Sequence, residues 1–115
     1  MNLEDLAARL RAFARERDWE QFHAPKNLAM ALAVETAELM EHFQWLTEKQ
    51  SGELPPEARQ LVAAELADVL IYTVRLADRL GVELEPAVEA KILVNAARYP
   101  VEKSRGSVKK YSQLG

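Results

Sequence analysis

The sequence has no cysteine, only four glycines, and an aromatic content of 7% in 115 residues. Without cysteine the chain can form neither a disulfide nor a thiolate metal site, which fits a reducing compartment. No apolar run approaches the length of a transmembrane helix, and the charged N-terminal stretch MNLEDLAARLRAF is unlike a signal peptide. We therefore expect a cytoplasmic protein that does not associate with membranes.

The chain also lacks an excess of positive charge, because its formal net charge is −3. A general electrostatic affinity for DNA or RNA is therefore not expected. Alanine, leucine and glutamate dominate the composition instead, and together with scarce glycine they favour helices. The length suits one small domain over residues 1–115, with a modest core.

Four helical segments are predicted, over about residues 3–17, 26–46, 56–80 and 85–98. Asn2 suits an N-cap, Pro25 and Pro56 suit helix starts, and Gly81 and Pro100 suit helix ends. The segments DWEQFHAP and TEKQSGELPPE are expected to be irregular, and residues 103–115 form a basic tail without periodicity. The predicted fold is an all-α, up-and-down bundle of about four helices.

The third predicted helix is apolar on most of its circumference. A monomer of four short helices cannot cover such a surface completely. We therefore expect the chain to bind at least one copy of itself and form a dimer or a larger assembly.

Two acidic pairs interrupt apolar stretches, Glu35 with Glu38 in ALAVETAELM and Glu65 with Asp68 in AAELADVLIY. The members of each pair are three residues apart, so they share one helix face. Two antiparallel helices would bring the four carboxylates together, where they would repel one another unless a divalent cation is bound. Oxygen ligands suit Mg²⁺, Mn²⁺ or Ca²⁺.

These carboxylates also allow other interpretations. A single ExxE or ExxD is more often a solvated helix face than a site, and only the conjunction of two buried-looking pairs favours a metal. A di-iron bundle needs Glu-x-x-His from two helices. The only such pair here, Glu20 and His23, lies in an irregular segment, and His42 follows Glu38 at a spacing of four. Magnesium is therefore favoured over iron.

Residues that could bind a substrate occur on other segments. Lys91, Asn95 and Arg98 share one face of the last predicted helix and suit phosphate or sugar oxygens, although an ordinary polar face would look the same. Trp19 and Trp45 flank the second predicted helix and could stack on a base, although core or interface packing explains each equally well. Two more candidates are His23, close to Trp19, and Tyr72, on the face of Glu65 and Asp68.

The chain resembles the MazG-like, all-α nucleoside triphosphate pyrophosphohydrolases, whose mark is ExxE, a spacer and ExxD. It is most similar to their dCTP pyrophosphatase branch. The similar stretches cover most of the chain in order: DWEQFHAPKN, ETAELMEHFQW, ELADVLIY, KILVNAARYP and KKYSQL. One departure is that Ala96 and Ala97 stand before Arg98, where relatives in this branch can be more basic.

The resemblance implies hydrolysis of a nucleoside triphosphate, dCTP or a modified dCTP, to the monophosphate and pyrophosphate in nucleotide-pool sanitation. It implies Mg²⁺, with Mn²⁺ as a substitute, bound by Glu35, Glu38, Glu65 and Asp68. It further places Trp19, His23 and Trp45 around the base, and Lys91 and Asn95 at the phosphates or sugar. The resemblance also implies assembly as a tetramer.

In this mechanism Glu35 or Glu38 would orient or deprotonate the attacking water, and the sequence does not choose between them. Two other classes of function stay open at this stage. One is a non-catalytic helical binding or oligomerisation module, and the other is a nucleotide sensor without turnover.

Overall fold

A computed structural model describes all 115 residues, and it contains helices and connecting segments but no strand. The all-α class is therefore confirmed. The chain forms two compact units, Met1–Val82 and Glu83–Gly115, which are described separately below. None of its helices combines the length and the hydropathy that crossing a lipid bilayer requires.

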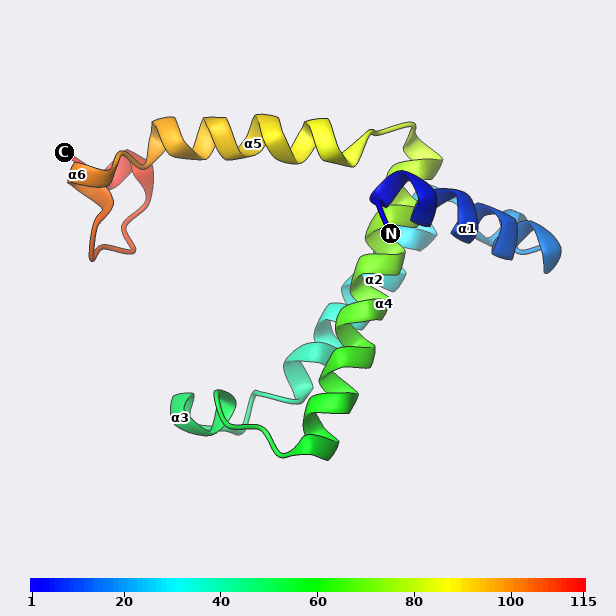
Figure 1. Cartoon of the computed structure of the whole chain (residues 1–115), viewed down its shortest axis with the longest axis horizontal. Coiled ribbons are helices and arrows are strands. Elements are labelled where there is room, and N and C mark those ends of the chain that lie inside the picture. The colour runs from blue at the N-terminus through cyan, green and yellow to red at the C-terminus, as the bar shows by residue number, and fades with distance from the viewer. The chain divides into compact units, whose positions relative to one another are not determined.

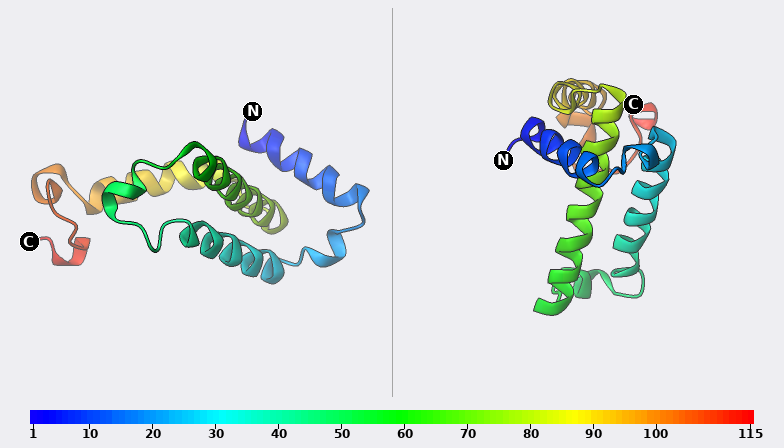
Figure 2. Two further views of the ribbon diagram at one scale, coloured as in Figure 1. Left: turned by 90° about the horizontal axis from the view of Figure 1, so that it is seen from below. Right: turned by 90° about the vertical axis from the view of Figure 1, so that its right-hand side faces the viewer.

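The first unit is built around one long helix, α4 (Pro56–Leu80). Both α1 (Leu3–Glu16) and α2 (Pro25–Glu41) pack against it. The chain descends through α2 and returns through α4, so these two helices lie side by side and antiparallel (Figures 1 and 2). This pairing is the arrangement that the two acidic motifs require.

Local chemistry explains why the helices begin and end where they do. The Asn2 side chain accepts a hydrogen bond from the backbone N–H of Asp5 (2.7 Å), which caps α1. Pro25 and Pro56 occupy the first positions of α2 and α4, where a missing N–H costs nothing. Gly81 ends α4 with φ of 70°, a left-handed conformation that favours glycine. These predicted starts and stops are confirmed.

The buried core of the first unit is small and consists of Leu6, Ala14, Leu28, Val62, Val74 and Ala77. An ion pair between Arg11 Nη2 and Asp78 Oδ1 (2.6 Å) also joins α1 to α4. Large apolar side chains of α4 remain exposed in the single chain, among them Leu61, Leu66 and Leu70.

The second predicted helix is longer than the helix in the structure. It ends at Glu41 rather than near residue 46, because the N–H groups of His42 and Phe43 bond to carbonyls three residues back. Such bonds tighten the backbone and end the α-helical ladder. The predicted loop at residues 47–57 contains a further short helix, α3 (Glu48–Ser51), because Thr47 and Gln50 form a capping box. The segment DWEQFHAP likewise includes a 3₁₀ turn, η1 (Glu20–Phe22).

The second unit contains α5 (Leu84–Arg98), α6 (Val101–Ser104) and the 3₁₀ turn η2 (Tyr111–Gln113). The tail is therefore more ordered than its sequence predicts. The guanidinium of Arg98 lies 4.5 Å from the ring centroid of Tyr111, and the Tyr99 and Tyr111 rings meet edge to face at 6.2 Å. In total the chain has six α-helices rather than about four, because the two single-turn helices α3 and α6 are too short to show a helical period in the sequence.

Candidate functional site

Antiparallel packing of α2 on α4 brings the two acidic pairs to one place. Carboxylate oxygens of Glu35, Glu38 and Glu65 all lie within 4.8 Å of one another. Each of these three side chains is half-buried. Three carboxylates at this spacing can serve as ligands of one cation.

These carboxylates lack the hydrogen bonds that buried oxygens normally have. Glu35 Oε2 and Glu65 Oε2 are both buried, and neither has a hydrogen-bond partner. Burial, then the neighbouring Glu65 and Glu38 and finally Asp68, raises the pKa of Glu35 from its ordinary value of 4.5 to about 7. Orphaned oxygens and mutual repulsion are both relieved by a divalent cation, so the residues fit such an ion.

Asp68 is near this group but is not one of its three close members. Its charge contributes to raising the pKa of Glu35, and it is half-buried one turn after Glu65 on α4. The structure therefore brings three of the four predicted ligands close enough together to bind one ion, and Asp68, the fourth, lies near them.

His23 and Trp19 lie together near the C-terminal part of α4. Arg75 Nε donates a hydrogen bond to His23 Nδ1 (3.1 Å), and Arg79 Nε donates to the His23 carbonyl (3.1 Å). The Trp19 and His23 rings meet at 6.4 Å between centroids. Burial, followed by the charges of Arg75 and Arg79, lowers the pKa of His23, so its neutral form is favoured.

Trp45 and Tyr72 occupy different surroundings. Trp45 follows the end of α2 and is 87% exposed, which excludes a core role in the single chain. Tyr72 is half-buried, four residues after Asp68 on the same face of α4. Trp19 precedes α2 and Trp45 follows it, so a rise of 1.5 Å per residue separates them by roughly 25 Å.

The predicted phosphate-binding residues all belong to the second unit. Lys91, Asn95 and Arg98 are exposed on α5 and follow the spacing of one helix face. Arg98 stacks on Tyr111, which restrains its guanidinium. Their role as substrate ligands stays a prediction.

Sequence reasoning missed a basic group that joins α1 to α4. Arg75 is only 4% exposed, which is unusual for an arginine, and it lies on the same helix as Glu65 and Asp68. Its Nη1 donates to Asp78 Oδ2 (3.1 Å), which also accepts from Arg11. The spacing of Arg75, Asp78 and Arg79 on one helix face was a signal that could have identified this group.

Comparison with known proteins identifies the family to which this acidic site belongs. The model of the MazG-like family matches residues 30–114, which include both acidic pairs. The chain belongs to the MazG-like family. Pyrophosphatases of this family generally use a divalent metal, which agrees with the group of three carboxylates.

Similar proteins come from animals and from an archaeon. dCTP pyrophosphatase 1 of Mus musculus is 50% identical over 114 residues, a match covering 97% of this chain and 67% of the relative. The Homo sapiens protein of the same name is 47% identical, with the same coverage. The crystal structure of a pyrophosphatase from Archaeoglobus fulgidus matches 84% of this chain and 91% of its own, with a TM-score of 0.79 and 39% identity. The predicted enzyme class, a pyrophosphohydrolase resembling dCTP diphosphatase, is confirmed.

The raised pKa of Glu35 predicts a pH-dependent stability of the metal-free protein. The folded chain holds a proton on Glu35 that the unfolded chain releases near pH 4.5, so the free energy of unfolding falls as the pH rises from there to about 7. Glu35→Gln removes this loss. In EDTA, we expect its melting temperature to exceed that of the wild type at pH 8 and to approach it at pH 4.5.

Glu41→Gln is the matched control, because Glu41 is exposed at the end of the same helix. Thermal unfolding followed by circular dichroism measures the difference between the variants. A Glu35→Gln effect that is identical at pH 4.5 and pH 8 would contradict the assignment of this pKa.

Proposed function

We propose that this chain hydrolyses dCTP or a modified dCTP to the monophosphate and pyrophosphate, with Mg²⁺ as its cofactor, and thereby removes unwanted nucleotides from the pool. The observation that carries the proposal is the group of three carboxylates between α2 and α4, two of which have a buried oxygen without a partner. The relatives named dCTP pyrophosphatase 1 support the choice of substrate.

In this proposal Glu35, Glu38, Glu65 and Asp68 hold the metal. When bound, a divalent cation neutralises phosphate oxygens and stabilises the pyrophosphate leaving group. All four residues offer hard oxygen ligands, which suit Mg²⁺ and allow Mn²⁺ to replace it.

The carboxylates also position the attacking water. Water attacks the α-phosphorus, the bond to the bridging oxygen of the β-phosphate breaks, and one proton must be accepted. Glu35 and Glu65 each have a buried oxygen that lacks a partner, and these two therefore need a cation most. Glu38 has no such oxygen, so it is better placed to orient the water and accept its proton.

His23 supplies a way to select the base. Arginine has no acceptor atom, so the Arg75–His23 hydrogen bond requires an unprotonated Nδ1, and neutral His23 then carries its hydrogen on Nε2. Cytosine offers acceptors at N3 and O2, whereas thymine and uracil carry a hydrogen on N3. Thymine and uracil also offer carbonyl oxygens as acceptors, so an Nε2–H donor beside Trp19 would favour cytosine over thymine where it is directed at N3.

The metal assignment predicts that Glu65→Ala loses most activity and weakens Mg²⁺ binding, because the remaining carboxylates no longer form a complete ligand group. Glu41→Ala, an exposed change on α2, should retain both. Turnover across the common dNTPs and NTPs with Mg²⁺, and a calorimetric titration with Mg²⁺, are the measurements. Full turnover by Glu65→Ala would remove the basis of the proposal.

The base assignment predicts different effects for two substitutions. Trp45→Ala should raise KM for every nucleotide by a similar factor of about 10, because stacking contributes roughly 1–3 kcal/mol per base and tolerates any base. His23→Ala should instead narrow the gap in kcat/KM between dCTP and dTTP. An unchanged KM in Trp45→Ala for all substrates would place Trp45 outside the binding site.

Self-association is also part of the proposal. Leu61, Leu66 and Leu70 leave an apolar surface on α4 that a second copy could cover. Because Trp19 and Trp45 lie at opposite ends of α2, both can stack on one base only if they come from two copies of the chain. Lys91, Asn95 and Arg98 would then serve the phosphates or sugar of the assembled enzyme.

We expect light scattering to find a dimer or a tetramer at micromolar concentration. Leu70→Glu places a charge in the apolar surface and should shift the protein toward the monomer, whereas Val108→Glu, at a fully exposed position, should not. A wild-type protein that stays monomeric at this concentration would contradict the expected assembly.

A further inference from the structure

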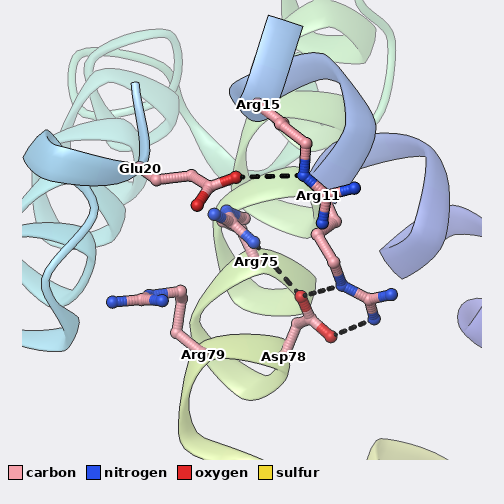
Figure 3. A pocket seen from close by; sticks show the side chains of 6 residues that line it. All are labelled: Arg11, Arg15, Glu20, Arg75, Asp78 and Arg79. Atoms are coloured by element: carbon pink, nitrogen blue, oxygen red, sulfur yellow. Dashed lines mark hydrogen bonds and ion pairs between the residues drawn. The ribbon is translucent and has the colours of Figure 1, made fainter. Parts of the chain in front are cut away.

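A cavity of about 430 Å³ lies beside α1 and α4, within the first unit. Six charged side chains line it: Arg11, Arg15, Glu20, Arg75, Asp78 and Arg79 (Figure 3). None of the six is a member of the candidate metal site formed by Glu35, Glu38 and Glu65. Arg75 follows Glu65 by ten residues on α4, which corresponds to about 15 Å along the helix. The cavity is thus a separate feature of the fold.

Every arginine of this cavity uses its Nε to bind an acceptor inside the protein. Arg11 Nε donates to Asp78 (3.1 Å), and Arg15 Nε donates to Glu20 (3.4 Å). Arg75 Nε and Arg79 Nε donate to the ring and to the carbonyl of His23, respectively, each at 3.1 Å. These bonds hold the guanidinium groups in place without any ligand.

Most of the terminal nitrogens of the same arginines remain free. Only two of them meet a protein acceptor, Arg11 Nη2 and Arg75 Nη1, and both donate to Asp78. Arg15 and Arg79 have no terminal nitrogen engaged, as Figure 3 illustrates. Positioned N–H groups without partners are suited to an oxyanion, whose oxygens accept several such bonds at once.

The charge of the cavity points to the same kind of ligand. Four guanidinium groups face two carboxylates, and His23 adds no charge because its pKa is lowered. The carboxylate of Asp78 is already engaged by the protein, because it accepts hydrogen bonds from both Arg11 and Arg75. The cavity is therefore positive within a chain whose formal net charge is −3.

We propose that this cavity is a second anion site, which binds a polyphosphate through the free guanidinium nitrogens of Arg15 and Arg79, assisted by Arg11 and Arg75. Pyrophosphate is the ligand to which we commit, because guanidinium groups from two helices surround a space larger than a single phosphate needs. The relevance of pyrophosphate to the enzyme rests on the proposed function, in which it is a product. The bound anion would tie α1 to α4.

Isothermal titration calorimetry of the full chain with pyrophosphate tests the site. Low salt preserves the electrostatic attraction between the arginines and the anion, and EDTA removes any metal from the candidate site at Glu35, Glu38 and Glu65. The double variant Arg15→Gln/Arg79→Gln should raise the dissociation constant for pyrophosphate by about tenfold or more, because charge-assisted hydrogen bonds are lost. The matched control Arg9→Gln/Arg59→Gln removes two exposed arginines from the same two helices and should change it less than about twofold.

Glu20→Gln gives a test of opposite sign. It removes a negative charge from the cavity and leaves Arg15 Nε with a weaker, uncharged acceptor, so it should tighten pyrophosphate binding. This variant keeps the proposal testable even if the double arginine variant does not fold. Titrations with inorganic phosphate and with dCTP establish whether the ligand is a free product or the triphosphate of a nucleotide.

Two results would overturn the proposal. One is a wild-type protein that binds no pyrophosphate at millimolar concentration in EDTA. The other is an equal loss of binding in the control double variant, which would leave the cluster as an ion-pair network that only holds α1 on α4. Because binding is measured without metal and without turnover, an inactive enzyme would not affect this test.

Discussion

Glu35, Glu38 and Glu65 repel one another where α2 packs against α4, and the packing of these helices has to compensate for that repulsion. The antiparallel contact of α2 with α4 forces these carboxylates together, and two of their oxygens are buried without partners. Such an arrangement opposes folding, so apolar contacts elsewhere along the same helices must offset it. Leu28 on α2 and Val74 on α4 are the two largest fully buried side chains and supply that stabilisation.

The long helix α4 carries two sites of opposite charge. Its middle presents Glu65 and Asp68, and its C-terminal part presents Arg75 and Arg79. The Coulomb energy falls with distance, so at a separation of about 15 Å the charges of the two regions interact more weakly than the close contacts within each region. His23 contacts the basic region, and its pKa is lowered by burial and then by the charges of Arg75 and Arg79, so its neutral form is favoured.

The small core of the first unit explains why so much apolar surface remains. The whole chain has only six buried hydrophobic side chains, and all six lie in the first unit. By contrast, Leu66 of α4 is 53% exposed. A helix of 25 residues offers more circumference than α1 and α2 can cover. The exposed tryptophan at the end of α2 belongs to the same pattern, in which residues that look like core in the sequence lie on the surface of the single chain.

The helical class, the bounds of α4 and the two acidic pairs could all be predicted from the amino-acid sequence. Periodicity, the prolines at helix starts and Gly81 are local signals, and their effects act within one or two turns. The single-turn helices α3 and α6 were missed because four residues are too few to establish a period. The close approach of three carboxylates with Asp68 near them, and the hydrogen bond from Arg75 to His23 across 52 positions of the chain, became known from the folded chain alone. These relations depend on how one helix is rotated and shifted against another, which follows from packing over the whole interface rather than from any local spacing.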